Sequence, residues 1–97
     1  MVVGTFRLPE TRRVAARAAL ERVIGLCRAE PGCIAYSYAE DVLEPGLFRV
    51  SEAWTDRAAL TAHFESAHMR RWQEERAALG MSERQVTAYT VSGEEEL

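Results

Sequence analysis

Four segments of the chain alternate between apolar and polar residues with the period of two that predicts a β-strand. The segments cover residues 2–8, 33–40, 47–54 and 84–91. Pro9 ends the first, Pro31-Gly32 precedes the second, and Glu44-Pro45-Gly46 turns the chain between the second and the third. On the second strand, one face is predicted to carry Ile34, Tyr36 and Tyr38. The third places on one face Phe48, Val50, Glu52 and Trp54.

Two further segments have the period of an α-helix. The pattern predicts a helix over residues 10–29 with one apolar stripe, made of Val14, Ala18, Val23, Ile24 and Cys27. Glu30-Pro31-Gly32 ends this helix, because proline disfavours helical backbone in the residue before it. The second helix begins after a cap from Thr55 or Asp56 and closes at Gly80. Ser66 interrupts its pattern, so we expect a bend or two short helices there.

The predicted order is β-α-β-β-α-β, the split βαβ arrangement of a ferredoxin-like α+β fold. This order gives a four-stranded antiparallel sheet with both helices on one face, and the other face then needs a cover. The length of 97 residues allows one domain, which we place at residues 1–92. Residues 93–97 are an acidic tail that we expect to be mobile.

Composition and charge exclude several classes of partner. The net charge of −3 gives no electrostatic reason to expect nucleic acid or an anionic membrane. No apolar run approaches the roughly 20 residues that span a bilayer. The N-terminus lacks the pattern of a signal peptide, so the cytoplasm is the expected location.

The residue types present limit the chemistry further. All 12 basic residues are arginine, so catalysis through a lysine Schiff base is excluded, and the chain has no asparagine amide. Cys27 and Cys33 match no redox motif and are expected to be reduced. The chain has no glycine-rich phosphate loop and no G-x-S-x-G motif, and no flavin or nicotinamide cofactor is expected.

His68 is the best candidate for a catalytic base, because histidine is the usual proton acceptor near neutral pH. The alternative is a core or interface histidine that bonds to a backbone carbonyl. His63 falls beside the buried stripe of its helix, where such a residue more often packs locally. Five residues separate the two histidines by roughly 140° on a regular helix, so they would share a metal ion only if Ser66 bent the helix. No metal site is expected.

Aromatic and charged residues near these histidines are candidates for substrate binding. The candidates are Trp54, His63, Trp72, Tyr36 and Arg49. For both tryptophans, packing in the core is the more common role. Glu52 lies on an otherwise apolar strand face, and a buried carboxylate needs a partner. We expect an ion pair with an arginine such as Arg49 or Arg7.

Three motifs are characteristic: the EPGC of residues 30–33, the E-x-W of residues 52–54 and the L-x-x-H-F-x-S-x-H of residues 60–68. These motifs, in this order, resemble the antibiotic biosynthesis monooxygenase family. The resemblance covers nearly the whole chain and implies a dimeric α+β barrel, in which two copies pack sheet against sheet as a homodimer. It also implies a pocket for a small molecule bordered by Trp54, with His68 near its mouth.

The resemblance leaves two functions open. The first is a cofactor-independent monooxygenase that oxidises an aromatic, anthrone or quinol-type substrate with molecular oxygen. The second is a non-catalytic dimeric barrel that binds a small molecule or responds to stress, or an oxygen-independent cyclase or isomerase. The haem-degrading branch of the family is disfavoured, because Phe6, His63 and Gln73 stand where its asparagine, tryptophan and histidine are expected.

Overall fold

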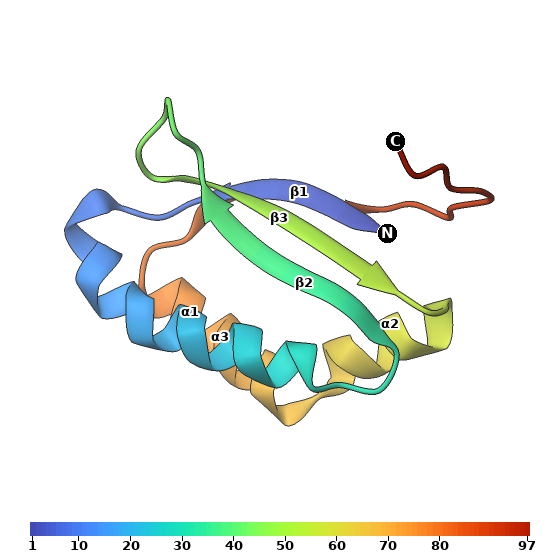
Figure 1. Cartoon of the computed structure of the whole chain (residues 1–97). Coiled ribbons are helices and arrows are strands. Elements are labelled where there is room, and N and C mark those ends of the chain that lie inside the picture. The colour runs from blue at the N-terminus through green and yellow to red at the C-terminus, as the bar shows by residue number, and fades with distance from the viewer.

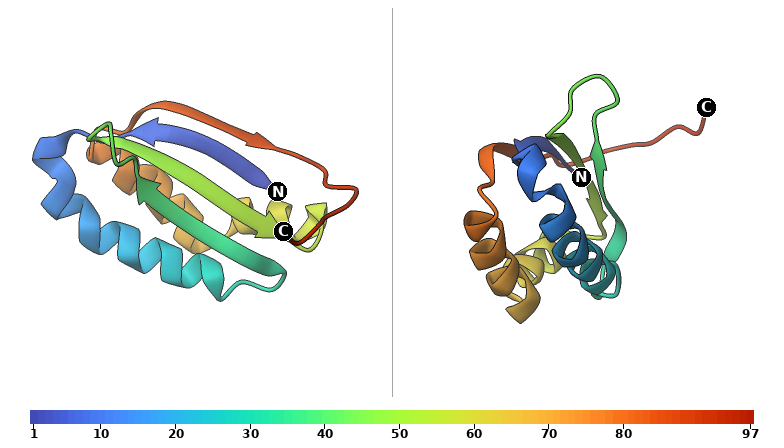
Figure 2. Two further views of the ribbon diagram at one scale, coloured as in Figure 1. Left: turned by 45° about the horizontal axis from the view of Figure 1, so that its top comes forward. Right: turned by 90° about the vertical axis from the view of Figure 1, so that its left-hand side faces the viewer.

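Four antiparallel strands form one sheet in the order β2-β3-β1-β4, as a computed structural model that describes residues 1–97 shows (Figure 1). The helices lie on one face of this sheet, and the other face is uncovered in the single chain (Figure 2). The elements along the chain are β1 (Val2–Arg7), the short 3-10 helix η1 (Glu10–Arg12), α1 (Arg13–Arg28), β2 (Cys33–Glu40), β3 (Leu47–Trp54), α2 (Arg57–Glu65), α3 (Ala67–Ala78) and β4 (Ser82–Ala88). The predicted ferredoxin-like arrangement is confirmed.

The last strand lies earlier in the chain than the alternating pattern predicts. It runs over Ser82–Ala88 in place of residues 84–91. Its partner β1 begins at Val2, which pairs with Ala88, so later residues have no strand beside them beyond one backbone pair between Met1 and Tyr89. Residues 93–97 have no regular secondary structure, and their mobility stays a prediction.

A bulge at the start of β2 changes which side chains face the helices. Cys33 pairs with Trp54 and Ala35 with Ala53, so the two strands are out of step by one residue at Ile34. Ile34 is therefore 66% exposed, whereas Tyr36 is buried. The prediction that Ile34 shares a face with Tyr36 is wrong, because the alternation restarts after the bulge.

The buried stripe of α1 also differs from the prediction. The residues that face the sheet are Ala16, Ala19, Val23 and Cys27. Their spacing of three or four residues follows one side of a helix. Val14 precedes Val23 by nine positions, roughly half a turn around the helix, and is 90% exposed. The small residues of the stripe let α1 lie close to the sheet.

Ser66 divides the second helical segment into α2 and α3, as the sequence predicts. Its backbone is extended, with φ −67° and ψ 151°. The hydroxyl donates to the carbonyl of His63 at 2.6 Å and accepts from the amide of Met69 at 3.3 Å, so one side chain ends α2 and caps α3. Asp56 caps the start of α2 by accepting from the amide of Ala59 at 2.8 Å.

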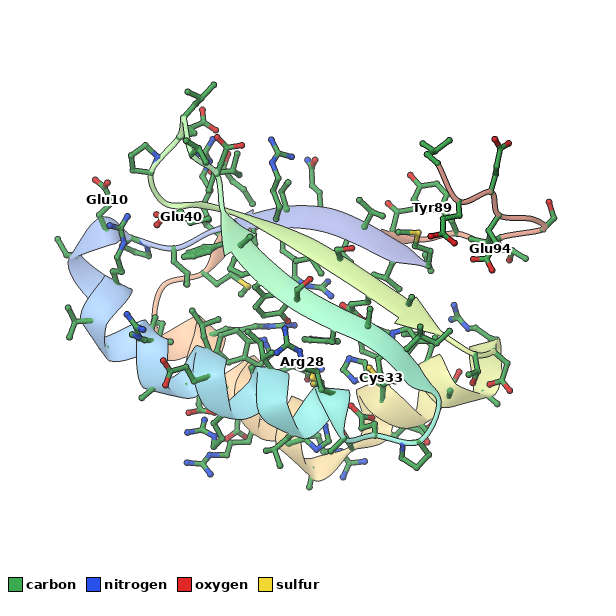
Figure 3. All side chains as sticks on the ribbon, viewed as in Figure 1. Glu10, Arg28, Cys33, Glu40, Tyr89 and Glu94 are labelled. Carbon is green, nitrogen blue, oxygen red and sulfur yellow. The ribbon has the colours of Figure 1, made fainter.

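Large side chains fill the space between the sheet and the helices (Figure 3). The largest fully buried ones are Trp72, Tyr36 and Phe6. No helix of the structure combines the length and the apolar character that crossing a membrane requires. The candidate site lies in this layer, where the elbow between α2 and α3 faces the end of α1.

Candidate functional site

One carboxylate joins the end of α1 to both sides of the helix break. The Oε2 atom of Glu30 accepts from Nδ1 of His63 at 2.7 Å and from Nε2 of His68 at 2.9 Å. His63 lies in the last turn of α2 and His68 in the first turn of α3. The side chain of His63 is fully buried, and that of His68 is 20% exposed. The cluster therefore leads from the interior toward the surface.

The break at Ser66 overturns the reason for expecting the two histidines to lie apart. The prediction assumed a regular helix, whereas the break at Ser66 between α2 and α3 lets both rings face Glu30. Together with Cys27 these side chains place four metal-ligating atoms within 4.8 Å of one another. The two nitrogens lie 2.7 and 2.9 Å from the carboxylate oxygen, closer than the ~3.3 Å between neighbouring ligands of tetrahedral zinc. This spacing is that of a hydrogen-bonded unit, and a metal ion would have to spread it apart.

The second nitrogen of His63 faces the interior without a hydrogen-bond partner. Because Nδ1 donates to Glu30, a neutral ring carries its proton there and leaves a lone pair on Nε2. The nearest charged group is Oε1 of Glu52 at 4.0 Å. That oxygen accepts from Nε1 of Trp54 at 3.0 Å. Two carboxylates thus flank one imidazole, Glu30 at Nδ1 and Glu52 near Nε2.

The expected ion pair between Glu52 and an arginine does not form. Arg49 lies on the uncovered face of the sheet and pairs with Asp41 at 3.0 Å. Arg7 pairs with Glu44 at 3.1 Å and with Glu83 at 3.0 Å. Both arginines alternate to the side of their strand that points away from the helices, whereas Glu52 points toward them. Trp54 supplies the hydrogen bond that the carboxylate needs.

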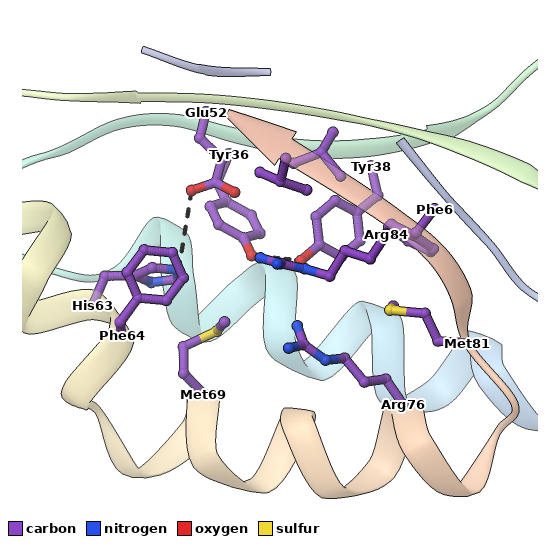
Figure 4. Close-up of a pocket in the computed structure, with 12 residues that line it drawn as sticks. Phe6, Tyr36, Tyr38, Glu52, His63, Phe64, Met69, Arg76, Met81 and Arg84 are labelled. Carbon is purple, nitrogen blue, oxygen red and sulfur yellow. Dashed lines mark hydrogen bonds and ion pairs between the residues drawn. The ribbon is translucent and has the colours of Figure 1, made fainter. Parts of the chain in front are cut away.

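A narrow pocket opens beside His63 and Glu52, between the sheet and the helices α2 and α3 (Figure 4). Its lining includes Tyr36, Tyr38, Phe64, Met69, Arg76 and Arg84. The two tyrosine hydroxyls are bonded to each other at 2.6 Å. The free interior holds little more than about one water molecule, so a ligand must enter from the open side or displace side chains.

The predicted site residues divide into four groups by position. His63 and Tyr36 line the pocket. Trp54 and His68 stand behind the lining, Trp54 through its bond to Glu52 and with its ring centre 4.7 Å from that of His63. Trp72 is a fully buried core residue whose ring centre lies 6.4 Å from that of Tyr38. Arg49 is remote from the pocket, on the opposite face of the sheet.

Three polar residues of the site were not predicted from the sequence. Glu30 was assigned only to the helix end, because its two bonds reach across more than thirty positions of the chain. Arg76 and Arg84 line the pocket from α3 and β4. A signal existed for Arg76, which has no acidic residue three or four positions away on its helix.

Burial sets the protonation of several groups in the pocket. Burial raises the pKa of Tyr38 to about 12 and also raises that of Tyr36, so both phenols keep their protons at neutral pH. Burial raises the pKa of Glu52, against the lowering effects of Trp54 and His63. Burial, and then the charge of Arg84, lower the pKa of Arg76.

We expect Glu52→Gln to stabilise the protein at neutral pH. The pKa of Glu52 is raised on folding, so its carboxylate opposes folding by an amount that is absent below the unfolded pKa of about 4.3, grows as the pH rises toward the raised value and is complete above it. The glutamine keeps an oxygen for the indole of Trp54 and carries no charge. Urea unfolding from about pH 4 to about pH 8 should show a gain that grows with pH. A gain that shrinks as the pH rises would contradict this reading.

The family model described as antibiotic biosynthesis monooxygenase matches residues 1–75. The matched range contains Glu30, His63 and His68. An uncharacterised protein of Synechocystis is 29% identical over 92 residues, which make up 95% of this chain and 63% of that protein. The chain therefore spans less than two thirds of this curated relative.

Several solved structures share the fold. A candidate antibiotic biosynthesis monooxygenase from Deinococcus radiodurans has a TM-score of 0.91 and 24% identity, with coverage of 100% of this chain and 98% of that one. A Pseudomonas aeruginosa protein has a TM-score of 0.80 and 26% identity, with coverage of 94% and 92%. A Mycobacterium tuberculosis protein has a TM-score of 0.77 and 27% identity, with coverage of 96% of both chains.

Proposed function

Since the chain belongs to the antibiotic biosynthesis monooxygenase family, we propose that it is a cofactor-independent monooxygenase that acts on a small aromatic, anthrone or quinol-type substrate. One observation carries the proposal. A fully buried imidazole, His63, lines a pocket with aromatic walls, and its Nε2 atom lies beside Glu52 without a hydrogen-bond partner. A buried nitrogen without a hydrogen-bond partner costs stability. A ligand in the pocket could satisfy this nitrogen by giving it a proton.

The proposed chemistry asks little of the protein beyond a base and a dry pocket. Loss of a proton converts an anthrone or a quinol into an electron-rich anion that reduces molecular oxygen. In the anthrone case the reacting CH₂ group becomes a carbonyl, one oxygen atom enters the product and the other leaves as water. The two hydrogens of the substrate supply the electrons, so the overall reaction balances without an external reductant. The enclosed site orients the anion and keeps bulk water away.

In this proposal the proton moves along the histidine–carboxylate cluster. Nε2 of His63 accepts it from the substrate, and Nδ1 holds its own proton toward Glu30. Glu30 in turn contacts His68, which is partly exposed and connects the relay to solvent. His68, the base predicted from the sequence, is therefore proposed as the outer member of the relay. Glu52 stabilises the charged ring of His63 from its other side.

The remaining groups shape the pocket and its field. The hydroxyls of Tyr36 and Tyr38 stay protonated and can donate to an oxygen that becomes negative during the reaction. Trp54 orients Glu52, and Trp72 supports the ring of Tyr38 from the core. Arg49 takes no part in the proposed site, because it lies on the opposite face of the sheet.

A second candidate is a non-catalytic small-molecule-binding protein on the same fold. The observation that favours it is the narrow interior, which leaves little free room for a polycyclic ring. A related possibility is an isomerase, because the proposed relay moves a proton whether or not oxygen takes part.

Oxygen uptake separates these functions. The purified protein is mixed with a panel of anthrones and quinols in an oxygen electrode, with heat-denatured protein as the control for spontaneous oxidation. A monooxygenase consumes oxygen faster than the control and forms the oxidised product. Product without oxygen consumption would indicate isomerisation. Binding of panel members without any product would favour the non-catalytic candidate.

We also propose that the protein is a homodimer in which two copies pack sheet against sheet. The uncovered face of the sheet supports this, since it presents Val3 and Ile34 with 45% and 66% of their surface exposed. Small and hydroxyl side chains such as Ala35, Ser37 and Ser51 make up much of the rest of that face. Such a face can approach a second sheet closely.

A further inference from the structure

A wider groove continues from the pocket between β4 and the helices α2 and α3. The pocket and the groove share Phe64, Arg76, Arg84 and Val86 in their linings. The groove adds Arg57 at the start of α2 and Gln73 on α3. It is therefore lined by three arginines and by no acidic residue. Arg76 and Arg84 line both the pocket and the groove, so they lie where the two meet.

None of these three arginines forms an ion pair, although burial raises the pKa of Glu52 in the same pocket and the charge of Arg84 acts to lower it. Six other arginines of the chain form ion pairs with carboxylates: Arg7, Arg13, Arg17, Arg22, Arg49 and Arg71. Arg57, Arg76 and Arg84 form none, although the chain carries 15 acidic residues and a net charge of −3. Arg76 is also half-buried, where an unpaired charge costs more than it does at the surface.

Arg76 and Arg84, which line both the pocket and the groove, also repel each other. Burial and the neighbouring charge of Arg84 both lower the pKa of Arg76, so its charged form is disfavoured from two sides. An anion between the two guanidinium groups would remove the repulsion and supply hydrogen-bond acceptors. Arg76 is in the last turn of α3, where the helix dipole is negative, which favours a singly charged group over a dianion.

We propose that the groove binds the carboxylate of an aromatic carboxylic acid, held between Arg76 and Arg84 with its ring directed toward the pocket. Planar guanidinium groups pair with a carboxylate through two parallel hydrogen bonds. Phe64 and Val86 line both the groove and the pocket, so they contact the apolar part of such a ligand on its way inward. The assignment rests on the proposed function, to which it adds the charge of the substrate.

Binding of matched ligands tests this assignment without any need for turnover. The probes are 2-naphthoate and its uncharged isostere 2-naphthamide, titrated into the protein by calorimetry. Charge-assisted hydrogen bonds contribute about 1.5–3 kcal/mol, so naphthoate should bind roughly 10- to 150-fold more tightly than naphthamide. Arg76→Gln and Arg84→Gln should each remove most of this preference, because they weaken the binding of naphthoate far more than that of naphthamide.

Arg70→Gln is the matched control, because Arg70 is an exposed arginine of the same helix that lines neither the pocket nor the groove. It should keep the full preference. Circular dichroism of each variant verifies folding, and naphthamide binding verifies that the pocket is intact. Equal binding of the two probes by the parent protein, or an equal loss of preference in Arg70→Gln, would overturn the proposal. Tighter binding of 2-naphthyl phosphate than of naphthoate would overturn the choice of a singly charged group.

The outcomes also separate this inference from the proposed function. A preference for naphthoate in a protein that consumes no oxygen with any substrate would keep the carboxylate site and remove the monooxygenase. The opposite result has two parts: the two probes bind equally, and neutral anthrones are oxidised at the same rate by the parent protein, Arg76→Gln and Arg84→Gln. It would keep the monooxygenase and remove the carboxylate site.

Discussion

Replacing His63 with alanine is expected to lower kcat/KM for the oxygenated substrate by about 10²- to 10⁴-fold, the usual contribution of a positioned general base. His63 is the histidine that lines the pocket, and its Nε2 atom has no hydrogen-bond partner. His68→Ala leaves that nitrogen in place and removes only the outer end of the relay. Its effect should therefore be smaller. Initial rates in the oxygen electrode measure both.

Loss of the His63 ring also affects packing, so the experiment needs a readout that a structural role would not change. Free imidazole added to His63→Ala can occupy the space that the variant leaves and accept the proton. Rescue of the rate by imidazole, increasing with the fraction of unprotonated imidazole, is expected for a base. A variant that folds and binds naphthamide but gains nothing from imidazole would contradict this role. A larger loss in His68→Ala than in His63→Ala would return the role of base to His68.

Replacing Trp72 with alanine is expected to lower the free energy of unfolding by about 3–5 kcal/mol, the range for truncating a large aromatic residue in a core. Trp72 is fully buried in the larger of two core clusters, together with Val23, Tyr36 and Met69. Domains of this size are stable by about 5–15 kcal/mol, so the variant should be marginal at room temperature. Urea unfolding followed by circular dichroism measures the loss.

Trp72→Phe is the matched control for this prediction. It keeps most of the aromatic surface and removes an indole N–H that has no hydrogen-bond partner in the core. The loss of volume and the removal of an unsatisfied donor oppose each other, so the net change should be well below that of alanine. Similar losses in the two variants would mean that the indole nitrogen contributes a bond. A loss below about 1 kcal/mol in Trp72→Ala would contradict the assignment of Trp72 to the core.

The strands in the middle of the chain could be predicted from the sequence to the residue. Both β2 and β3 have the predicted bounds, because Pro31-Gly32 and Glu44-Pro45-Gly46 set their limits locally. The break at Ser66 was also predictable, since it depends on one hydroxyl and its nearest backbone neighbours. These features share a cause that lies within a few residues of the chain.

Features that depend on distant residues were not predictable in this way. The end of β4 depends on where β1 begins, and the exposure of Ile34 depends on a register shift against β3. The site shows the same limit. The sequence predicted both His63 and His68 as site residues, but the contact that joins them is made by Glu30, which lies more than thirty positions earlier. Likewise, Arg76 and Arg84 come together only once β4 lies beside β1.

The position of Glu30 has a consequence for the ways in which the sequence can change. This single carboxylate fastens three helix ends to one another and also lies in the middle of the proposed proton path. A substitution at this position would affect both folding and turnover, whereas a substitution at most other positions affects only one of them. In a library of random variants, residue 30 should therefore tolerate fewer amino acids than its burial alone would suggest. Compensating changes should appear first at positions 63 and 68.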